Sequence, residues 1–263
     1  MKYVNLKGIK ISRFIIGGNP FSGFSHQGIE MDMRMKKYFI SQRIKETLRE
    51  AEQWGINTFI GRADNHILRL LLEYRQEGGK IQWIAQTCPE IKSQELSIDM
   101  AISGNPVGCY IHGGYVDFLF LNNEMGKIYP LIEKIKKYGI LSGIAGHISE
   151  VFLWAEENID VDFYMCSYYN PVNRKEKPEK DILQEEIFSD NDREKMIMAI
   201  KKLKKPVIHY KIMAAGRKNP EEAISFMSKN ARENDMVCIG IYQEEKRWMI
   251  KENIELMRKF GFL

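Results

Sequence analysis

The strongest constraint on the fold is an alternation of short apolar, β-rich runs with longer amphipathic runs along almost the whole chain. This alternation is the pattern of βα units built on a parallel sheet. Eight runs predict strands, and they are Arg13–Gly18, Thr58–Arg62, Gln82–Thr87, Val107–Gly113, Leu141–His147, Phe163–Asn170, Pro206–Ile212 and Met236–Tyr242. Eight is the number of strands at which a parallel barrel closes.

The amphipathic runs between these strands predict helices, and they are Ser41–Trp54, Ile67–Tyr74, Ser93–Ile102, Lys127–Tyr138, Ser149–Glu157, Asp190–Leu203, Pro220–Arg232 and Glu245–Phe260. The length of 263 residues matches one such barrel, which takes about 250. No linker, repeat or low-complexity tract interrupts the pattern. We therefore predict an α/β protein whose residues 1–263 form a single (β/α)8 TIM barrel domain.

Composition narrows the classes of partner. The 39 basic and 35 acidic residues are spread along the chain, whereas nucleic-acid binders concentrate their positive charge, so we expect no nucleic-acid partner. There is no signal-peptide pattern and no apolar run of about 20 residues, so we expect a cytoplasmic protein without a membrane span. Scattered cysteines without a CxxC pair predict buried free thiols: Cys88, Cys109, Cys166 and Cys238. The sequence does not predict an oligomeric state.

Two connections are longer than a barrel needs, one over residues 19–40 and one over residues 171–188. Both follow strands, so both emerge at the end of the barrel where active sites lie. The first is rich in glycine and aromatic residues, which favours a lid over a substrate. The second is highly charged, and a lid and a surface excursion both remain open for it.

Several motifs resemble those of one family, and they are Leu6-Lys7-Gly8 through Gly17-Gly18, Ala51-Glu52-Gln53-Trp54-Gly55-Ile56-Asn57-Thr58-Phe59, Lys137-Tyr138-Gly139 into Ser142-Gly143-Ile144, Tyr168-Tyr169-Asn170-Pro171 and Lys251-Glu252-Asn253-Ile254. On these motifs the chain resembles a remote member of the aldo/keto reductase superfamily. It is also similar to a group of uncharacterised bacterial barrels in its "Y-I-H-G-G" (Tyr110–Gly114) and "K-I-x-A-A-G-R" (Lys211–Arg217) strand ends. Both resemblances imply a barrel fold.

The chain departs from the reductase pattern in its catalytic residues. The family uses Asp, Tyr, Lys and His, and only His112 matches; Arg62 stands in place of the Asp, Asn65 or His66 lies near the Tyr position, and the third strand ends without a Lys. The family's NADP 2′-phosphate site is replaced by Gln243-Glu244-Glu245, whose carboxylates would repel a phosphate. We therefore expect weak NADP binding or none, and the sequence identifies no other cofactor.

Strand parity predicts which side chains face the barrel mouth, because side chains alternate between the interior and the helices. On the fifth strand the bulky apolar residues share one parity and His147 shares the other, so His147 is predicted to point inward. Lys211 is predicted to point inward because burying its charge against the helices is costly. The same parity places His209 inside, one layer below Lys211.

His112, His147 and Lys211 are thus the predicted catalytic residues. Lys211 stays open as a Schiff-base nucleophile or as a fixed cation that holds a carboxylate or phosphate. The predicted substrate-binding residues lie at strand ends or in the loops that follow them: Asn19, Arg62, Asp64, His66, Gln86, Tyr168, Asn170 and Arg217. Gly216-Arg217 before a helix start favours an anion site, with an exposed glycine turn as the alternative. The spacing supports no metal site.

Two classes of function follow from this pattern. The first is an enzyme that acts on a small polar carbonyl or sugar-like substrate, phosphorylated or not. With most of the reductase tetrad missing, lyase or isomerase proton transfer is as well supported as reduction. The second is a non-catalytic, metabolite-binding barrel derived from a reductase. An idle pocket does not need several inward basic groups, which favours the enzyme.

Overall fold

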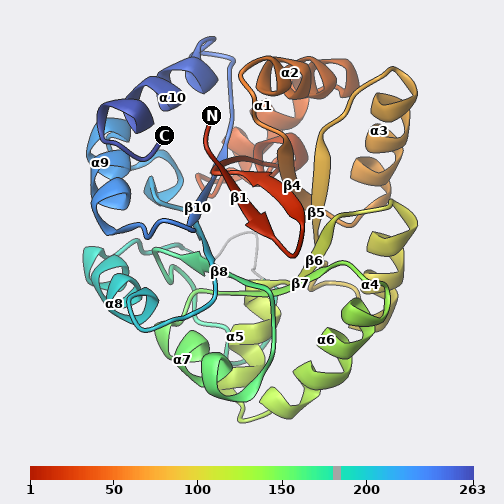
Figure 1. Ribbon diagram of the computed structural model, residues 1–263, viewed down its shortest axis with the longest axis vertical. Helices are drawn as coiled ribbons and strands as arrows, with labels where there is room; N and C mark the ends of the chain where they lie inside the picture. The colour runs from red at the N-terminus through yellow and green to blue at the C-terminus, as the bar shows by residue number, and fades with distance from the viewer. Residues whose placement is uncertain (180–184) are drawn as a thin grey trace.

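Eight parallel strands close into one barrel in the computed structural model, which describes residues 1–179 and 185–263. The strands follow one another around the barrel in chain order, and the last pairs with the first through the register of Val237 with Phe14 and Gly240 with Gly17. Figure 1 shows the helices as a ring around them. The predicted (β/α)8 barrel is confirmed, and its strands are β3 (Phe14–Gly17), β4 (Thr58–Arg62), β5 (Gln82–Gln86), β6 (Gly108–Ile111), β7 (Leu141–Gly146), β8 (Phe163–Ser167), β9 (Val207–Tyr210) and β10 (Met236–Gly240).

Ten helices accompany the strands among the described residues: α1 (Ile29–Tyr38), α2 (Ser41–Gln53), α3 (Asn65–Gln76), α4 (Gln94–Ser103), α5 (Gly113–Leu121), α6 (Ile128–Lys137), α7 (Ser149–Asn158), α8 (Asp190–Ile200), α9 (Pro220–Asn230) and α10 (Met249–Lys259). Short 3-10 turns stand at η1 (Pro20–Ser22), η2 (Met125–Lys127) and η3 (Ala214–Gly216). The sequence pattern did not predict α1, in the first long connection, or α5, directly after β6. The residues of α5 are apolar on almost every side of the helix, so its segment shows no amphipathic period.

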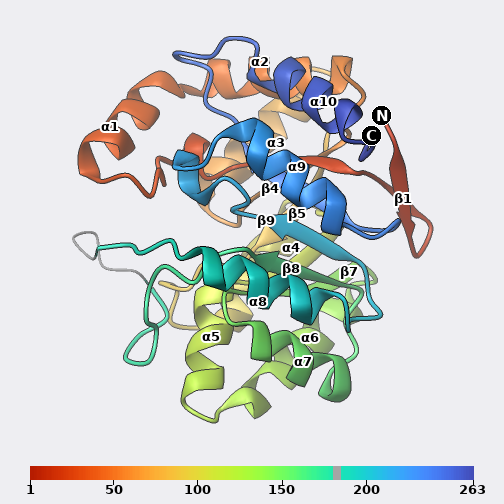
Figure 2. The same cartoon turned by 90° about the vertical axis from the view of Figure 1, so that its left-hand side faces the viewer.

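A hairpin of β1 (Tyr3–Leu6) and β2 (Ile9–Ser12) closes one end of the barrel. Its apolar side chains join the core inside the barrel: Val4, Leu6 and Ile11. The hairpin and α1 lie at opposite ends of the molecule (Figure 2). The N-terminal end is therefore closed by packing, and the C-terminal strand ends remain for a site.

The strands alternate between an inner and an outer core. The inner core contains the side chains of Ile15, Ile60, Ile84, Tyr110, Ala145, Phe163, Met165, Ile208 and Cys238. The outer core lies under the helices and contains the residues one position away, such as Ile16, Ile144, Cys166 and Val207. Burial of both faces explains why the strand runs are almost continuously apolar.

This alternation corrects two predictions. Tyr168 follows the parity of Cys166, so it packs in the outer core with its hydroxyl 3.1 Å from Nδ1 of His209 and does not reach the mouth. His209 is fully buried on the same helix-facing side, 3.3 Å from the carboxylate of Asp235, and not inside the barrel. The parity prediction for β9 is wrong because Ile208 points inward instead.

Cys88, Cys109, Cys166 and Cys238 are buried free thiols, as predicted. Burial raises the pKa of each thiol. Within the described residues, no helix combines the length and the apolar character that a bilayer crossing requires.

Candidate active site

A cavity of about 290 Å³ lies at the C-terminal ends of the strands. Its floor is apolar and comes from the inner core: Ile60, Tyr110, Met165 and Cys238. Polar side chains stand around this floor: Asn19, Gln86, Tyr210 and Lys211. The cavity also extends between β10 and α10, where Nδ2 of Asn253 has no hydrogen-bond partner among the described residues. Its size and mixed lining are those of a small-molecule site.

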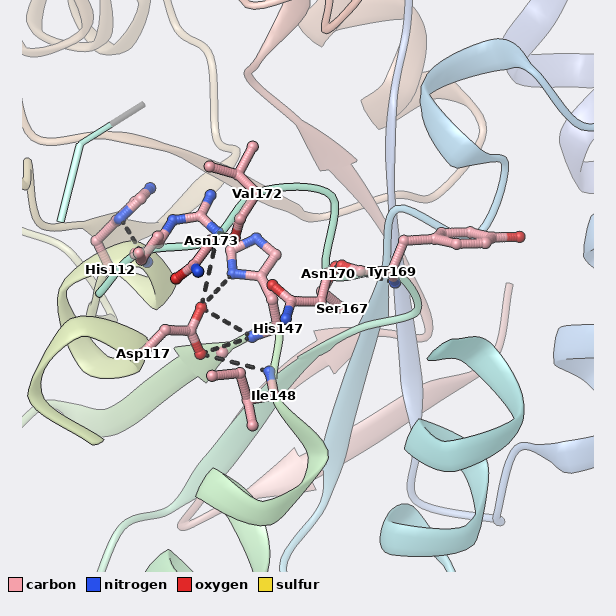
Figure 3. A network of polar contacts seen from close by, with 12 residues as sticks. His112, Asp117, His147, Ile148, Ser167, Tyr169, Asn170, Val172 and Asn173 are labelled. Atoms are coloured by element: carbon pink, nitrogen blue, oxygen red, sulfur yellow. Dashed lines mark hydrogen bonds and ion pairs between the residues drawn. The ribbon is translucent and has the colours of Figure 1, made fainter. Parts of the chain in front are cut away.

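Behind the cavity wall, Asp117 and His147 form a buried pair that joins α5 to the end of β7 (Figure 3). Nδ1 of His147 lies 2.7 Å from Oδ2 of Asp117, and the main-chain N of His147 donates to Oδ1 at 3.0 Å. The side chain of His147 is 4% exposed and that of Asp117 is 1% exposed. The carboxylate therefore binds the Nδ1–H tautomer and leaves Nε2 as a hydrogen-bond acceptor.

Nε2 of His147 is directed at Tyr210, whose hydroxyl lies 3.3 Å away. Tyr210 in turn lines the cavity, so it connects the buried pair to the space for a ligand. Gly113 makes this approach feasible, because a Cβ there would lie 3.1 Å from Cε1 of His147 and 3.2 Å from the Tyr210 hydroxyl. Asp117, His147 and Tyr210 thus form a chain of polar groups whose last member lines the cavity.

Burial sets the protonation states of this chain. It raises the pKa of Asp117 to about 6, so the group is ionised at neutral pH. It lowers the pKa of His147 well below its ordinary value, and the positive charges of Arg174 and Lys211 lower it further. It raises the pKa of the Tyr210 hydroxyl well above its ordinary value. At neutral pH the chain therefore consists of a carboxylate, a neutral imidazole and a protonated phenol.

Lys211 reaches the cavity by a change of backbone conformation rather than by strand alternation. Tyr210 already points toward the mouth, and its neighbour would face the helices in a regular strand. Lys211 instead has a φ of 56°, a left-handed conformation that costs a residue with a side chain about 1–2 kcal/mol. Both residues consequently line the cavity. The prediction that Lys211 points inward agrees with the structure, but for another reason.

Arg174 adds a buried positive charge close to the Asp117–His147 pair. Its guanidinium lies 3.9 Å from the Asp117 carboxylate, and its side chain is only 5% exposed. Nη1 donates to the carbonyl of Val172, while Nε has no partner among the described residues. Sequence reasoning missed Asp117, Tyr210 and Arg174. The one available signal was Asp117, a single charge within the apolar run of α5.

Several of the predicted catalytic and substrate-binding residues lie outside the cavity lining, and most of these have structural partners. His66 is exposed on the first turn of α3, and Asp64 caps that helix by accepting from the main-chain N of Ile67. Arg62 forms ion pairs with Asp64 and Glu90. His112 also caps a helix, because its Nδ1 accepts from the main-chain N of Gly114 in α5 at 3.0 Å.

Two other predicted residues stabilise loops around the mouth. Arg217 donates to the carbonyl of His26 at 2.8 Å and packs on the ring of Phe188, so its guanidinium holds loops together. Asn170 is joined to α8 through its main-chain N, which donates to Asp192 at 3.1 Å. Of the predicted substrate-binding residues, the cavity is lined by Asn19 and Gln86.

Loops from three strands meet over the cavity. Nδ1 of His26, after β3, lies 2.7 Å from Glu186 in the connection after β8. Gln27 donates to the carbonyl of Ala215, after β9, at 2.7 Å. His26 and Gln27 also line the cavity. The first long connection therefore covers the site, as a lid would.

Solved structures similar to this chain include several aldo-keto reductases. One from Pseudomonas aeruginosa is 14% identical with a TM-score of 0.66, and the match covers 98% of this chain and 94% of that one. The holo form of one from Bacillus halodurans is 10% identical with a TM-score of 0.61, covering 97% and 90%. An aldolase named QR15 is 12% identical with a TM-score of 0.51, covering 82% and 93%. No family model matches the chain, and no curated protein matches it in sequence.

The fold and the position of the site define a class, the (β/α)8 barrels with a small-molecule cavity at the C-terminal strand ends. Within this class the chain has an aldo-keto-reductase-like TIM barrel. At 10–14% identity this likeness describes the fold alone.

Proposed function

We propose that the protein is an enzyme that transfers a proton on a small polar carbonyl or sugar-like compound, as a lyase or an isomerase does. The observation that carries this proposal is the contact of the Asp117–His147 pair with the hydroxyl of Tyr210, a residue that lines the cavity. Such a chain is a general acid–base device, and here it ends at a residue that lines the cavity.

Two protons move in the same direction along this chain of polar groups. A proton that leaves the substrate passes to the oxygen of Tyr210, while the hydroxyl proton of Tyr210 passes to Nε2 of His147. The Asp117 carboxylate then stabilises the imidazolium, and the Lys211 ammonium stabilises the negative charge left on the substrate oxygen. In reverse, the same chain returns the proton to a different atom. The fixed-cation role of Lys211 is thus favoured over a Schiff base.

Nicotinamide adenine dinucleotide phosphate, the cofactor of the aldo-keto reductases, is poorly matched by the residues beside β10. The extension toward Asn253 is lined by Lys246 together with the carboxylate of Glu252, so the cation that a 2′-phosphate requires is accompanied there by an anion. The nearby Glu244 and Glu245 carboxylates both bind Arg34 and so neutralise it. We expect NADPH, titrated by its fluorescence, to bind more weakly than micromolar. Micromolar binding would restore reduction as the reaction.

Deuterium exchange tests the proton-transfer function directly. In D2O, the protein should exchange the hydrogen next to the carbonyl of dihydroxyacetone or its phosphate, followed by NMR. Tyr210→Phe and His147→Gln should each lower the rate about 100-fold, since each removes one link of the proton path. Lys211→Met should lower it about tenfold, equivalent to about 1.4 kcal/mol.

His66→Gln is the matched control for these variants, because His66 is exposed on α3 and should leave the rate unchanged. Borohydride trapping of Lys211 by the same ketones would replace the fixed cation with a Schiff base. Tight binding of both probes without any exchange would favour the second function, a non-catalytic metabolite-binding barrel.

A further inference from the structure

Two uncharged amides line the cavity opposite the acid–base residues. Because the barrel closes in the order β10-β3-β4-β5-β6-β7-β8-β9, each strand faces the one four places along. Gln86 ends β5 and therefore faces Tyr210 on β9, across the mouth. Asn19 follows β3 and faces the end of β7, where His147 lies. The cavity thus has an amide side and an acid–base side.

Tyr110, in the inner core of the barrel, fixes the orientation of the Gln86 amide. The hydroxyl of Tyr110 donates to Oε1 of Gln86 at 2.6 Å, and Tyr110 is 1% exposed within the inner core. Burial raises the pKa of Tyr110 well above its ordinary value, so the phenol keeps the proton that it donates to the carbonyl end of the amide. The Nε2 of Gln86, with its two hydrogens, is consequently left for the cavity.

Neither amide uses its donors within the described protein. Nε2 of Gln86 donates to no described residue, and the side chain of Asn19 forms no hydrogen bond there either, not even to cap η1. Both residues are partly exposed and both line the cavity. Amide donors and acceptors on an otherwise apolar floor match hydroxyl groups, which also donate and accept without charge.

We infer that the substrate is a polyhydroxylated carbonyl compound, bound with its hydroxyl groups on Asn19 and Gln86 and its reacting carbonyl end at Tyr210 and Lys211. This inference rests on the proposed function, because it takes the acid–base side from there. Gln86 and Asn19 then determine specificity, and Tyr110 is a positioning residue for Gln86.

Binding of a matched pair of ketones tests this inference. Erythrulose and 2-butanone share one carbon skeleton and one carbonyl position, and they differ only in three hydroxyl groups. By titration calorimetry or ligand-observed NMR, the protein should bind erythrulose at least tenfold more tightly. Gln86→Leu should reduce this preference about tenfold, because the site loses its fixed donor for a hydroxyl. Tyr110→Phe should reduce it in part, because the amide can then turn over.

Asn19→Ala is an independent test of the preference for erythrulose. The Asn19 side chain forms no hydrogen bond among the described residues, so its removal should leave the fold intact. This variant should lower the preference as Gln86→Leu does. The control is Gln82→Leu, on the same strand but at its other end, where the amide binds the carbonyl of Lys10. This change should leave the preference as it is.

The result that overturns the inference is equal binding of the two ketones, or a preference that survives both Gln86→Leu and Asn19→Ala. Deuterium exchange by a protein without preference would leave the proposed function standing. A preference for erythrulose with no exchange on any hydroxyketone would instead remove the proposed function and leave the amide side as a binding site.

Discussion

The ionised state of Asp117 determines what His147 can do. The carboxylate binds Nδ1 and the main-chain N of His147, so it both orients the ring and compensates an imidazolium. Because burial raises its pKa to about 6, Asp117 takes up a proton in a range where enzymes are readily assayed. The exchange rate should therefore fall as the pH is lowered through about 6. In Asp117→Asn the rate should be about 100-fold lower at pH 7.5, and that acidic limb should disappear from the pH–rate profile.

The pH dependence of the free energy of unfolding gives a second measurement of the Asp117 pKa. The folded pKa of Asp117 lies above its unfolded value of 3.8, so its protonated form favours folding at low pH, and this contribution is lost as pH rises through about 6. Relative to the original protein, Asp117→Asn should gain stability between pH 4 and pH 7.5, by up to about 3 kcal/mol, in urea unfolding. A difference that stays constant over this range would mean that Asp117 does not titrate there.

Helix α5 carries Asp117, and the first turn of this helix packs closely against the loop after β8. A Cβ on Gly114 would lie 2.3 Å from the carbonyl oxygen of Pro178 and 2.9 Å from Nε of Arg174. Gly114→Ala must therefore displace the loop after β8 and should destabilise the protein by about 1–3 kcal/mol in urea unfolding. The exchange rate should fall as well, since Arg174 lies next to Asp117.

Gly126→Ala is the control for this element. A Cβ at Gly126, in η2, would meet no atom within 4 Å, so its effect should stay within about 0.5 kcal/mol. Equal stability of the two variants would show that the loop after β8 moves without cost.

The whole barrel depends on the seam between its first and last strands. Arg13, just before β3, is 7% exposed and donates to the carbonyls of Asp235, Arg232 and Phe262, which join β3 to the start of β10 and to the C-terminus. Arg13→Met should lower the free energy of unfolding by about 3 kcal/mol, because buried carbonyls lose their donor. Urea unfolding measures this loss.

Lys10→Met tests the same removal of charge on the exposed hairpin and should change stability by less than about 0.5 kcal/mol. A loss in Arg13→Met no larger than in Lys10→Met would mean that water replaces the guanidinium at the seam.

The sequence by itself determined the barrel, because apolar periodicity is a local property and eight short buried runs have few other ways to pack. It also indicated that His147 lies at the end of β7, although the side chain packs behind the cavity wall against Asp117 and does not line the cavity. It failed at β9, where the strand ends at Tyr210 and a left-handed Lys211 interrupts the alternation on which parity depends.

Only the tertiary structure decided which groups work together. Asp117 and His147 come from different βα units, and their contact depends on how α5 packs against the end of β7. The sides of the cavity were equally hidden, because residues on β5 and β9 face each other only once the barrel closes. Periodicity along a chain fixes which face of an element is buried. Distances between elements arise from closure, packing and loop conformation, and these the local pattern does not contain.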